Sequence, residues 1–160
     1  MTLTQGVLYV HSAPSALIPH LEWAVGGACG APVRLDWLRQ PAQPGTHRCE
    51  YDWTGRAGTG ARIASALRDW ERLRYEVTED ATPDTEGMRW AWTPDLGMFS
   101  AQIGPSGDIV VPEERLRAAL ATADPSSAIR DLLGDPWDAE LEAFRYAGEG
   151  APVRWLHRAV

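Results

Sequence analysis

Apolar residues along the first half of the chain follow two periods, and together these predict six elements in the order β-α-β-β-α-β. Short apolar or alternating runs predict strands over residues 6–11, 33–39, 47–53 and 74–78. Apolar residues at helical spacing predict one helix after Ser12 or Ser15 as N-cap, and a second helix after the glycine-rich stretch 55–60. Gly26, Gly27 and Gly30 are expected to end the first helix.

This order is typical of the split-βαβ, ferredoxin-like folds, in which two helices cover one face of a four-stranded antiparallel sheet. The second half predicts a β-meander, with a hairpin of residues 88–93 and 98–103 around a Pro-Asp-Leu-Gly turn and a short strand at 108–111. Three helices are expected after it, beginning at Pro112, near Ser127 and at Asp135 as N-cap, with a last strand at 153–160.

The predicted fold is therefore α+β: a ferredoxin-like N-terminal half, a β-meander and C-terminal helices. We expect one domain of residues 1–160, with sub-domains at 1–82 and 87–160. A short motif repeats between the halves, because Leu-Glu at 21–22 and Gly-Ala-Pro-Val-Arg at 30–34 recur at 141–142 and 150–154. The repeat has two interpretations, coincidence or a pseudo-duplicated α+β unit.

Composition indicates a globular cytoplasmic protein. Hydrophobic residues make up 44% and charged residues 23% of the chain, as in ordinary folded domains. No apolar run approaches the roughly 18 residues of a membrane span, and the N-terminus does not resemble a signal peptide. With two cysteines only, a disulfide framework is not expected.

Charge argues against a nucleic-acid partner, since the net charge is −7 and phosphates require a basic face. All 15 basic residues are Arg, and eight of them lie among five acids in residues 34–74. Two interpretations stay open: ordinary solvated faces, or an Arg-bearing surface for an anionic ligand.

The glycine-rich stretch is the best candidate for a ligand site. Backbone N–H groups at a helix N-terminus bind phosphate, and glycines let a ligand approach closely. The candidate residues are Arg56, Gly58, Thr59, Gly60 and Arg62. The motif is neither a Walker A loop nor a dinucleotide fingerprint, and it is one residue short of the pyrophosphate loop of acetyltransferases, which it otherwise resembles. The alternative is a tight strand-to-helix turn.

Other chemistry is not expected. His47 and Cys49 would supply two metal ligands at most, so no metal site is predicted, and no cofactor. No nucleophile elbow surrounds the N-terminal serines, so no catalytic residue is predicted. The acid pair Glu79-Asp80 is expected in a solvated linker.

Eight tryptophans suggest either a large core or an aromatic patch for a protein partner, because Trp and Arg dominate interface hot spots. Trp90 and Trp92 share one face of their strand and are the candidates for an exposed partner surface. The others, Trp23, Trp37, Trp53, Trp70, Trp137 and Trp155, mostly fall on stripes expected to be buried.

Several segments resemble an uncharacterised actinobacterial family, domain of unknown function 3145. They are Gly6-Val-Leu-Tyr-Val-His-Ser12, Gly58-Thr-Gly-Ala-Arg-Ile-Ala-Ser-Ala-Leu67, Thr93-Pro-Asp-Leu-Gly97, and the C-terminal Phe144-Arg-Tyr-Ala-Gly and Gly150-Ala-Pro-Val-Arg-Trp-Leu-His157. The resemblance runs the whole length and brings no assigned activity. Through an expected gene neighbourhood with type II fatty-acid synthesis, it implies an accessory role near acyl-carrier or acyl-CoA chemistry.

Two functions follow as hypotheses. The first is a non-enzymatic binding or regulatory protein that docks on a protein partner, for example one of fatty-acid synthesis. The second is a phosphate- or CoA-binding protein, or an acyltransferase-like enzyme, that uses the loop 55–60. The sequence leaves the oligomeric state open, and a membrane partner is not expected.

Overall fold

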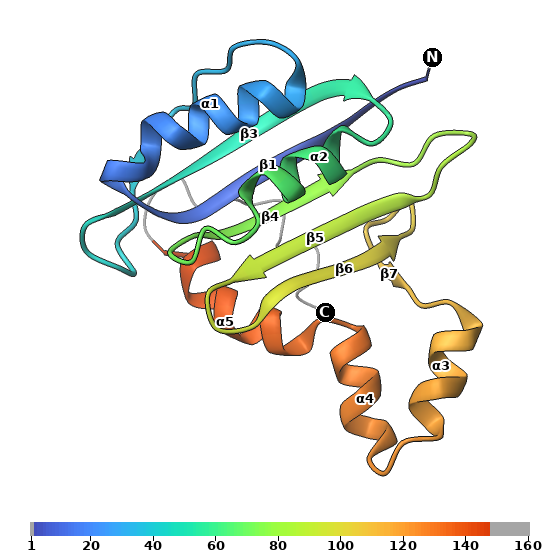
Figure 1. The fold of residues 1–160 in the computed structure, drawn as a ribbon. Helices are drawn as coiled ribbons and strands as arrows, with labels where there is room; N and C mark the ends of the chain where they lie inside the picture. The colour runs from blue at the N-terminus through green and yellow to red at the C-terminus, as the bar shows by residue number, and fades with distance from the viewer. Residues whose placement is uncertain (1, 148–160) are drawn as a thin grey trace.

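The computed structural model describes residues 2–147, which form one seven-stranded antiparallel sheet and five α-helices (Figure 1). The strands are β1 (Leu3–Pro14), β2 (Leu38–Arg39), β3 (Thr46–Arg56), β4 (Arg74–Glu79), β5 (Gly87–Thr93), β6 (Gly97–Ile103) and β7 (Ile109–Val110). The helices are α1 (Ile18–Cys29), α2 (Thr59–Leu67), α3 (Glu113–Leu120), α4 (Pro125–Leu132) and α5 (Asp135–Arg145), with a short 3-10 helix, Ser15–Leu17, before α1.

The fold is thus α+β, as predicted. The strand expected at 153–160 and the second copy of the repeated motif lie outside the described residues.

The strands lie in the order β2-β3-β1-β4-β5-β6-β7, so the sheet continues unbroken from the first half of the chain into the second. The predicted hairpin is confirmed, because β5 pairs with β6 from Gly87 opposite Ile103 to Thr93 opposite Gly97. Gly97, the first residue of β6 directly after the turn, has a φ of 75°, a conformation that glycine adopts without strain. The ferredoxin-like description of the first four strands stays a prediction.

Each face of the sheet is covered by different helices (Figure 1). On one face α1 and α2 pack over β1, β3 and β4, and bury Leu8, Val10, Tyr75 and Val77 with helix residues such as Ile63. On the other face α5 packs over β5 and β6, with Leu141 against Ala91, Phe99 and Ala101. Alternation along the strands therefore turns the odd-numbered residues of β1 up to His11, where the register shifts, and the even-numbered residues of β4 away from α1 and α2.

The strand predicted at 33–39 is wrong except for its last two residues, which form β2. The alternation is present, but residues 33–37 pair with no strand among residues 2–147. The backbone N–H of Leu35 instead donates to the carboxylate of Glu22 on α1, at 2.8 Å. This segment is therefore fixed to the helix that precedes it rather than to the sheet.

Three predicted helix boundaries are also wrong. Ser12 lies inside β1, which runs on to Pro14, and neither Ser12 nor Ser15 caps α1. Gly26 and Gly27 lie within α1, and only Gly30 ends it, in the left-handed conformation. Helix α5 has Gly134 as its N-cap, so Asp135 is its first residue rather than its cap.

Candidate functional site

The sequence predicts a ligand site at the glycine loop. In the structure, however, the N–H groups of this loop bond to a side chain of the protein itself. Gly58 is the N-cap of α2 with a φ of 93°. Its N–H donates to one carboxylate oxygen of Glu79 at 2.9 Å, and the N–H of Gly60 donates to the other at 2.7 Å. Glu79 is buried, so this carboxylate occupies the position that a bound anion would take. A phosphate or CoA pyrophosphate would have to displace it.

The side chains of the loop are directed at the protein as well. Arg62 donates to the hydroxyl of Thr59 at 2.7 Å and to the backbone carbonyl of Ala28 at 3.3 Å. Thr59 and Gly60 are buried, whereas Arg56 is exposed at the end of β3. The five candidate residues are therefore close in space, but their hydrogen bonds describe a capped strand-to-helix turn.

Glu79 is the residue that sequence analysis placed wrongly, in a solvated linker. It ends β4 and is 4% exposed. The sequence did hold a signal for the burial of Glu79. This position comes directly after the alternating run 74–78, and continuing the alternation turns its carboxylate towards the core.

Trp90 and Trp92 lie in the core rather than on an exposed patch. Trp92 is buried and stacks on Tyr75, with ring centroids 6.5 Å apart. Trp90 is half-buried and packs against the same core, close to Gly60 of α2. Of the two interpretations of the tryptophans, core packing describes this pair.

Trp23 on α1 is an exception among the six tryptophans that were expected to be mostly buried, since it is 84% exposed. It borders a groove of about 450 Å³ between α1 and the segment that follows it. The groove is lined mainly by small and apolar residues: Trp23, Gly26, Gly27, Gly30, Ala31, Pro32 and Val33, with Glu22. We call this the α1 surface. The sequence marks the α1 surface by a lack of charged residues, because Glu22 is the one Asp, Glu or Arg residue in positions 1–33.

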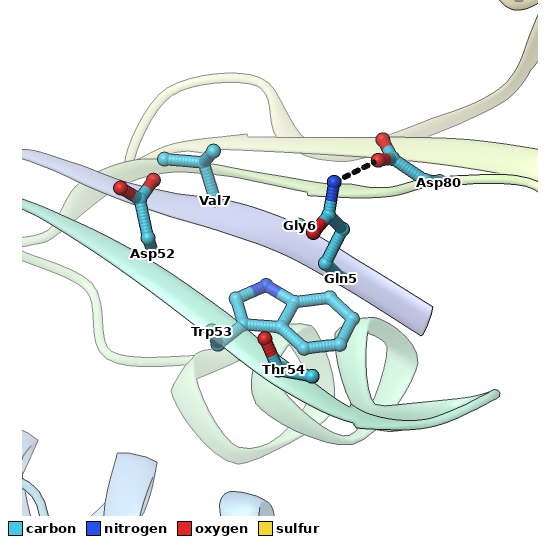
Figure 2. A pocket seen from close by; sticks show the side chains of 7 residues that line it. All are labelled: Gln5, Gly6, Val7, Asp52, Trp53, Thr54 and Asp80. Atoms are coloured by element: carbon cyan, nitrogen blue, oxygen red, sulfur yellow. Dashed lines mark hydrogen bonds between the residues drawn. The ribbon is translucent and has the colours of Figure 1, made fainter. Parts of the chain in front are cut away.

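A cavity of about 410 Å³ opens on the other face of the sheet, near the start of β1 (Figure 2). Its walls come from three adjacent strands: Gln5, Gly6 and Val7 of β1, Asp52, Trp53 and Thr54 of β3, and Asp80 after β4. The Gln5 amide donates to the Asp80 carboxylate at 3.1 Å. We call this the polar cavity.

Gly6 has a geometric reason for its place in that cavity. A Cβ at this position would lie 1.8 Å from the carbonyl oxygen of Thr78 and 2.6 Å from a ring carbon of Trp53. The close approach goes with an irregular strand pairing, in which the N–H of Val7 donates to the hydroxyl of Thr78 at 3.1 Å. Any side chain at Gly6 would push β1 and β4 apart.

A buried ionic cluster joins α5 to the sheet beside the polar cavity's strands. The Glu76 carboxylate is fully buried and accepts hydrogen bonds from His11 at 2.6 Å, Arg89 at 2.9 Å, and two nitrogens of Arg145 at 2.9 and 2.5 Å. Asp138 of α5 accepts from both arginines at 2.8 Å. We call these five residues the ionic cluster.

The charges of the ionic cluster balance one another. Burial alone would raise the pKa of Glu76, but the hydrogen bond from His11 and the charges of Arg89 and Arg145 outweigh it and hold that pKa well below its ordinary value. Burial likewise disfavours the charged form of Arg145, and the carboxylates of Glu76 and Asp138 outweigh it and raise its pKa. With every oxygen of Glu76 already bonded to protein groups, the arrangement holds a helix to the sheet rather than presenting a carboxylate to a substrate.

Metal-ligating groups do not gather in the part of the chain that the structure describes. No group of three or more His, Cys, Asp or Glu residues there could hold a metal ion. Cys49 is buried, and burial raises the pKa of its thiol to about 12. The neighbouring His47 bonds to the hydroxyl of Ser15 at 3.1 Å. Within residues 2–147, no helix is long and apolar enough to cross a membrane.

Comparison with known proteins identifies a family. Residues 7–158 match the family described as "Protein of unknown function (DUF3145)". No curated protein and no solved structure matches the chain.

Proposed function

This chain belongs to the DUF3145 family, and we propose that it is a non-enzymatic binding protein that docks on another protein through the α1 surface. The observation that supports the proposal is the exposure of Trp23 beside the groove. A large aromatic side chain that is 84% exposed is unusual on a protein surface, and Trp is the residue type most enriched among interface hot spots.

The surroundings of Trp23 specify the chemistry of the partner. The exposed residues along this side are uncharged: Pro19, His20, Gly27, Gly30, Ala31 and Pro32 in addition to Trp23. A Cβ added at Gly27 or Gly30 would meet nothing within 4 Å, so a partner's side chains have room to enter. The surface therefore suits the apolar side of a partner's helix or loop, and offers little to a nucleic acid or a charged ligand.

The proposal extends to the setting of the interaction. We place the protein in the cytoplasm, and we take the carrier proteins and enzymes of fatty-acid synthesis as the partners to test first. The sequence resemblance motivates that choice.

The test is recovery of a partner with a tagged full-length chain and with two variants. Trp23→Ala removes the anchor, and Leu120→Ala is the matched control because Leu120 is also well exposed but lies on α3. We expect wild type and Leu120→Ala to retain the same partner, and Trp23→Ala to retain it about tenfold less or worse, as for a hot-spot residue.

Both variants should unfold like the wild type, since each change is at an exposed position. Equal retention by all three proteins would contradict the α1 surface as the docking site. If purified carrier proteins and synthesis enzymes all fail to bind while another protein does so through Trp23, the docking function stands and the link to fatty-acid synthesis falls.

A further inference from the structure

The last strand but one, β6, has an edge that β7 covers only in part. β6 runs from Gly97 to Ile103, but β7 pairs only with its last two residues, Gln102 and Ile103. Residues 97–101 have β5 on one side and, among residues 2–147, no strand on the other. We call this stretch the β6 edge. It lies far along the sheet from β1 and β3, over which α1 packs, so it is a different surface from the α1 surface.

The hydrogen-bond pattern shows which backbone groups of β6 point outward. The N–H of Gly104 donates to the carbonyl oxygen of Asp108 at 2.8 Å, so these two residues form a hydrogen-bonded pair. In an antiparallel ladder such pairs alternate with non-hydrogen-bonded ones, so the pair that Gln102 forms with β7 is of the same kind. The N–H and C=O groups of Ser100 and Met98 point to the same side. Within residues 2–147 no backbone group pairs with them there.

Pro112 is the reason that β7 stops short. If β7 continued by two residues, its register would place position 112 opposite Ser100, at the next hydrogen-bonded pair. Proline has no N–H to donate there, and Pro112 is instead the N-cap of α3. Edge strands are commonly protected from other chains by charged residues or proline, and β6 contains neither. The β6 edge is therefore open to another strand.

A groove of about 210 Å³ lies at this edge. Three consecutive residues of β6, 100–102, line one side of it, and α3 and α4 contribute to the other. Its apolar lining residues are Met88, Ile109, Val110, Val111, Pro112 and Leu132. Figure 1 shows α3 and α4 beyond the β6–β7 edge of the sheet rather than over one of its faces. An open strand edge with pockets for side chains beside it is the arrangement in which a domain binds an extended peptide as an added strand.

Arg115 of α3 specifies a charge on that peptide. Within residues 2–147 it is the one charged residue that lines the groove. It is exposed and has no ion pair in this part of the chain, whereas Arg117 is paired with Glu113 at 2.6 Å. A guanidinium bonds most strongly to a carboxylate, so the peptide should carry one.

We propose that the β6 edge binds an extended peptide segment of a partner protein, which adds to the sheet as a further strand and carries an Asp or Glu side chain. The backbone of the peptide bonds to the outward N–H and C=O groups of Ser100 and Met98. Its carboxylate bonds to Arg115, and its apolar side chains contact Val110 and Leu132. This surface is separate from the α1 surface, and binding at one does not require the other.

An array of immobilised peptides, probed with the tagged full-length chain, tests the proposal. Each peptide has Glu at its first or last position and a combination of Val, Leu, Thr and Ser at the other positions, and a matched array has Lys in place of Glu. We expect a subset of the Glu peptides to bind, and their Lys counterparts to bind at least about tenfold more weakly, because attraction to Arg115 becomes repulsion. No binding to any Glu peptide, or equal binding to both arrays, would overturn the proposal.

A modified peptide tests the backbone pairing and leaves the protein unchanged. The Glu peptide that binds best is made with N-methyl groups on every second residue, in each of the two possible phases. Because the groups that face one neighbour recur at every second residue of a strand, one phase removes the N–H groups that would pair with the β6 edge. That peptide should lose binding and the other should keep it. Equal binding of the two would show that the peptide does not add to the sheet.

Variants locate the binding. Arg115→Gln should weaken the best Glu peptide at least about tenfold, and Arg117→Gln, the matched control on the same helix, should leave it unchanged. Ser100→Pro removes an N–H that β5 does not use, so the variant should fold and lose the peptide. If the peptide binds these variants and the wild type alike, it lies elsewhere and the assignment of the β6 edge is wrong.

Two further measurements separate this proposal from its alternatives. A dimer of the chain that Ser100→Pro dissociates, seen by native mass spectrometry, would show that a second copy occupies the β6 edge and would overturn the peptide as its occupant. Trp23→Ala should not change peptide binding, so failure of the docking function at the α1 surface and failure of this proposal are distinguishable.

Discussion

Replacing Glu76 by Gln tests the structural role of the ionic cluster. Glu76 and Asp138 carry two negative charges against the positive charges of Arg89 and Arg145, all within hydrogen-bond distance. The variant keeps the shape of the side chain but leaves both arginines sharing one carboxylate. Removing one partner from a buried ion pair costs about 3–5 kcal/mol, because the remaining charge stays desolvated and uncompensated.

That loss is large compared with the total stability of an ordinary domain, about 5–15 kcal/mol. With a urea dependence of about 2 kcal/mol per molar, the unfolding midpoint should fall by about 2 M. The assay is urea unfolding followed by tryptophan fluorescence at neutral pH. The matched control is Glu113→Gln, which breaks an exposed pair with Arg117 at 2.6 Å on α3 and should cost less than about 0.5 kcal/mol. If both variants lose the same small amount, the ionic cluster does not hold α5 to the sheet as we argue.

Comparison of the wild type with Glu76→Gln also tests how the stability of the folded protein depends on pH. Folding lowers the pKa of Glu76 below its ordinary value of 4.5, so the stabilisation from its charged form is complete above that value. It is lost as the pH falls through the folded-state pKa. The stability of the wild type should therefore drop between about pH 5 and about pH 2 more steeply than that of Glu76→Gln. Parallel curves for the two proteins would show that other carboxylates control the acid transition.

Three further predictions concern single residues. Gly6→Ala should prevent folding or cost more than about 3 kcal/mol, because its Cβ would overlap the Thr78 carbonyl oxygen. Gly27→Ala, in open space on α1, should instead stabilise the protein by up to about 1 kcal/mol. Thermal unfolding of the two variants tests both expectations. Glu79→Ala should cost about 2 kcal/mol and speed hydrogen exchange at the amides it binds, and unchanged exchange would contradict its capping role. The thiol of Cys49 should resist iodoacetamide at pH 8 in the folded protein and react after unfolding, since burial holds its pKa at about 12; rapid labelling of the native thiol would contradict this.

Local signals in the sequence predicted the fold where short-range contacts decide it. The hairpin of β5 and β6 rests on a turn sequence between two alternating runs, and the structure confirms it because both signals act over a few residues. Alternation along β3 likewise placed Cys49 and Trp53 together in the core, with Tyr51 packed against it. The run 33–39 carried the same alternation but forms no strand over residues 33–37, since a strand also needs a partner, and the hydrogen bond from the N–H of Leu35 to Glu22 keeps this segment beside α1.

The candidate sites were harder to predict, because they depend on contacts between distant parts of the chain. Helical spacing places Trp23 on the side of α1 opposite the buried Leu21 and Val25, but it could not show that this side is left uncovered, because that depends on how the rest of the chain packs. The polar cavity brings Gln5, Asp52 and Asp80 together from three strands, and no pattern of sequence spacing marks such a set. Glu76 lies between two core residues, so alternation alone turned it to the other face, but its arginine partners come from β5 and α5.

The glycine loop shows why a motif of this kind has two physical outcomes. A helix that begins with glycines presents N–H groups and a partial positive charge, and these require an anion whether it is a ligand or a side chain. The motif itself is the same in both cases. What separates them is whether an acid from an adjacent strand reaches the helix, and Glu79 at the end of β4 does so with both oxygens. Because the Glu79 carboxylate already accepts hydrogen bonds from the N–H groups of the loop, no phosphate is required to satisfy them. The exposed Trp23 and the β6 edge are better places to look for partners of this protein.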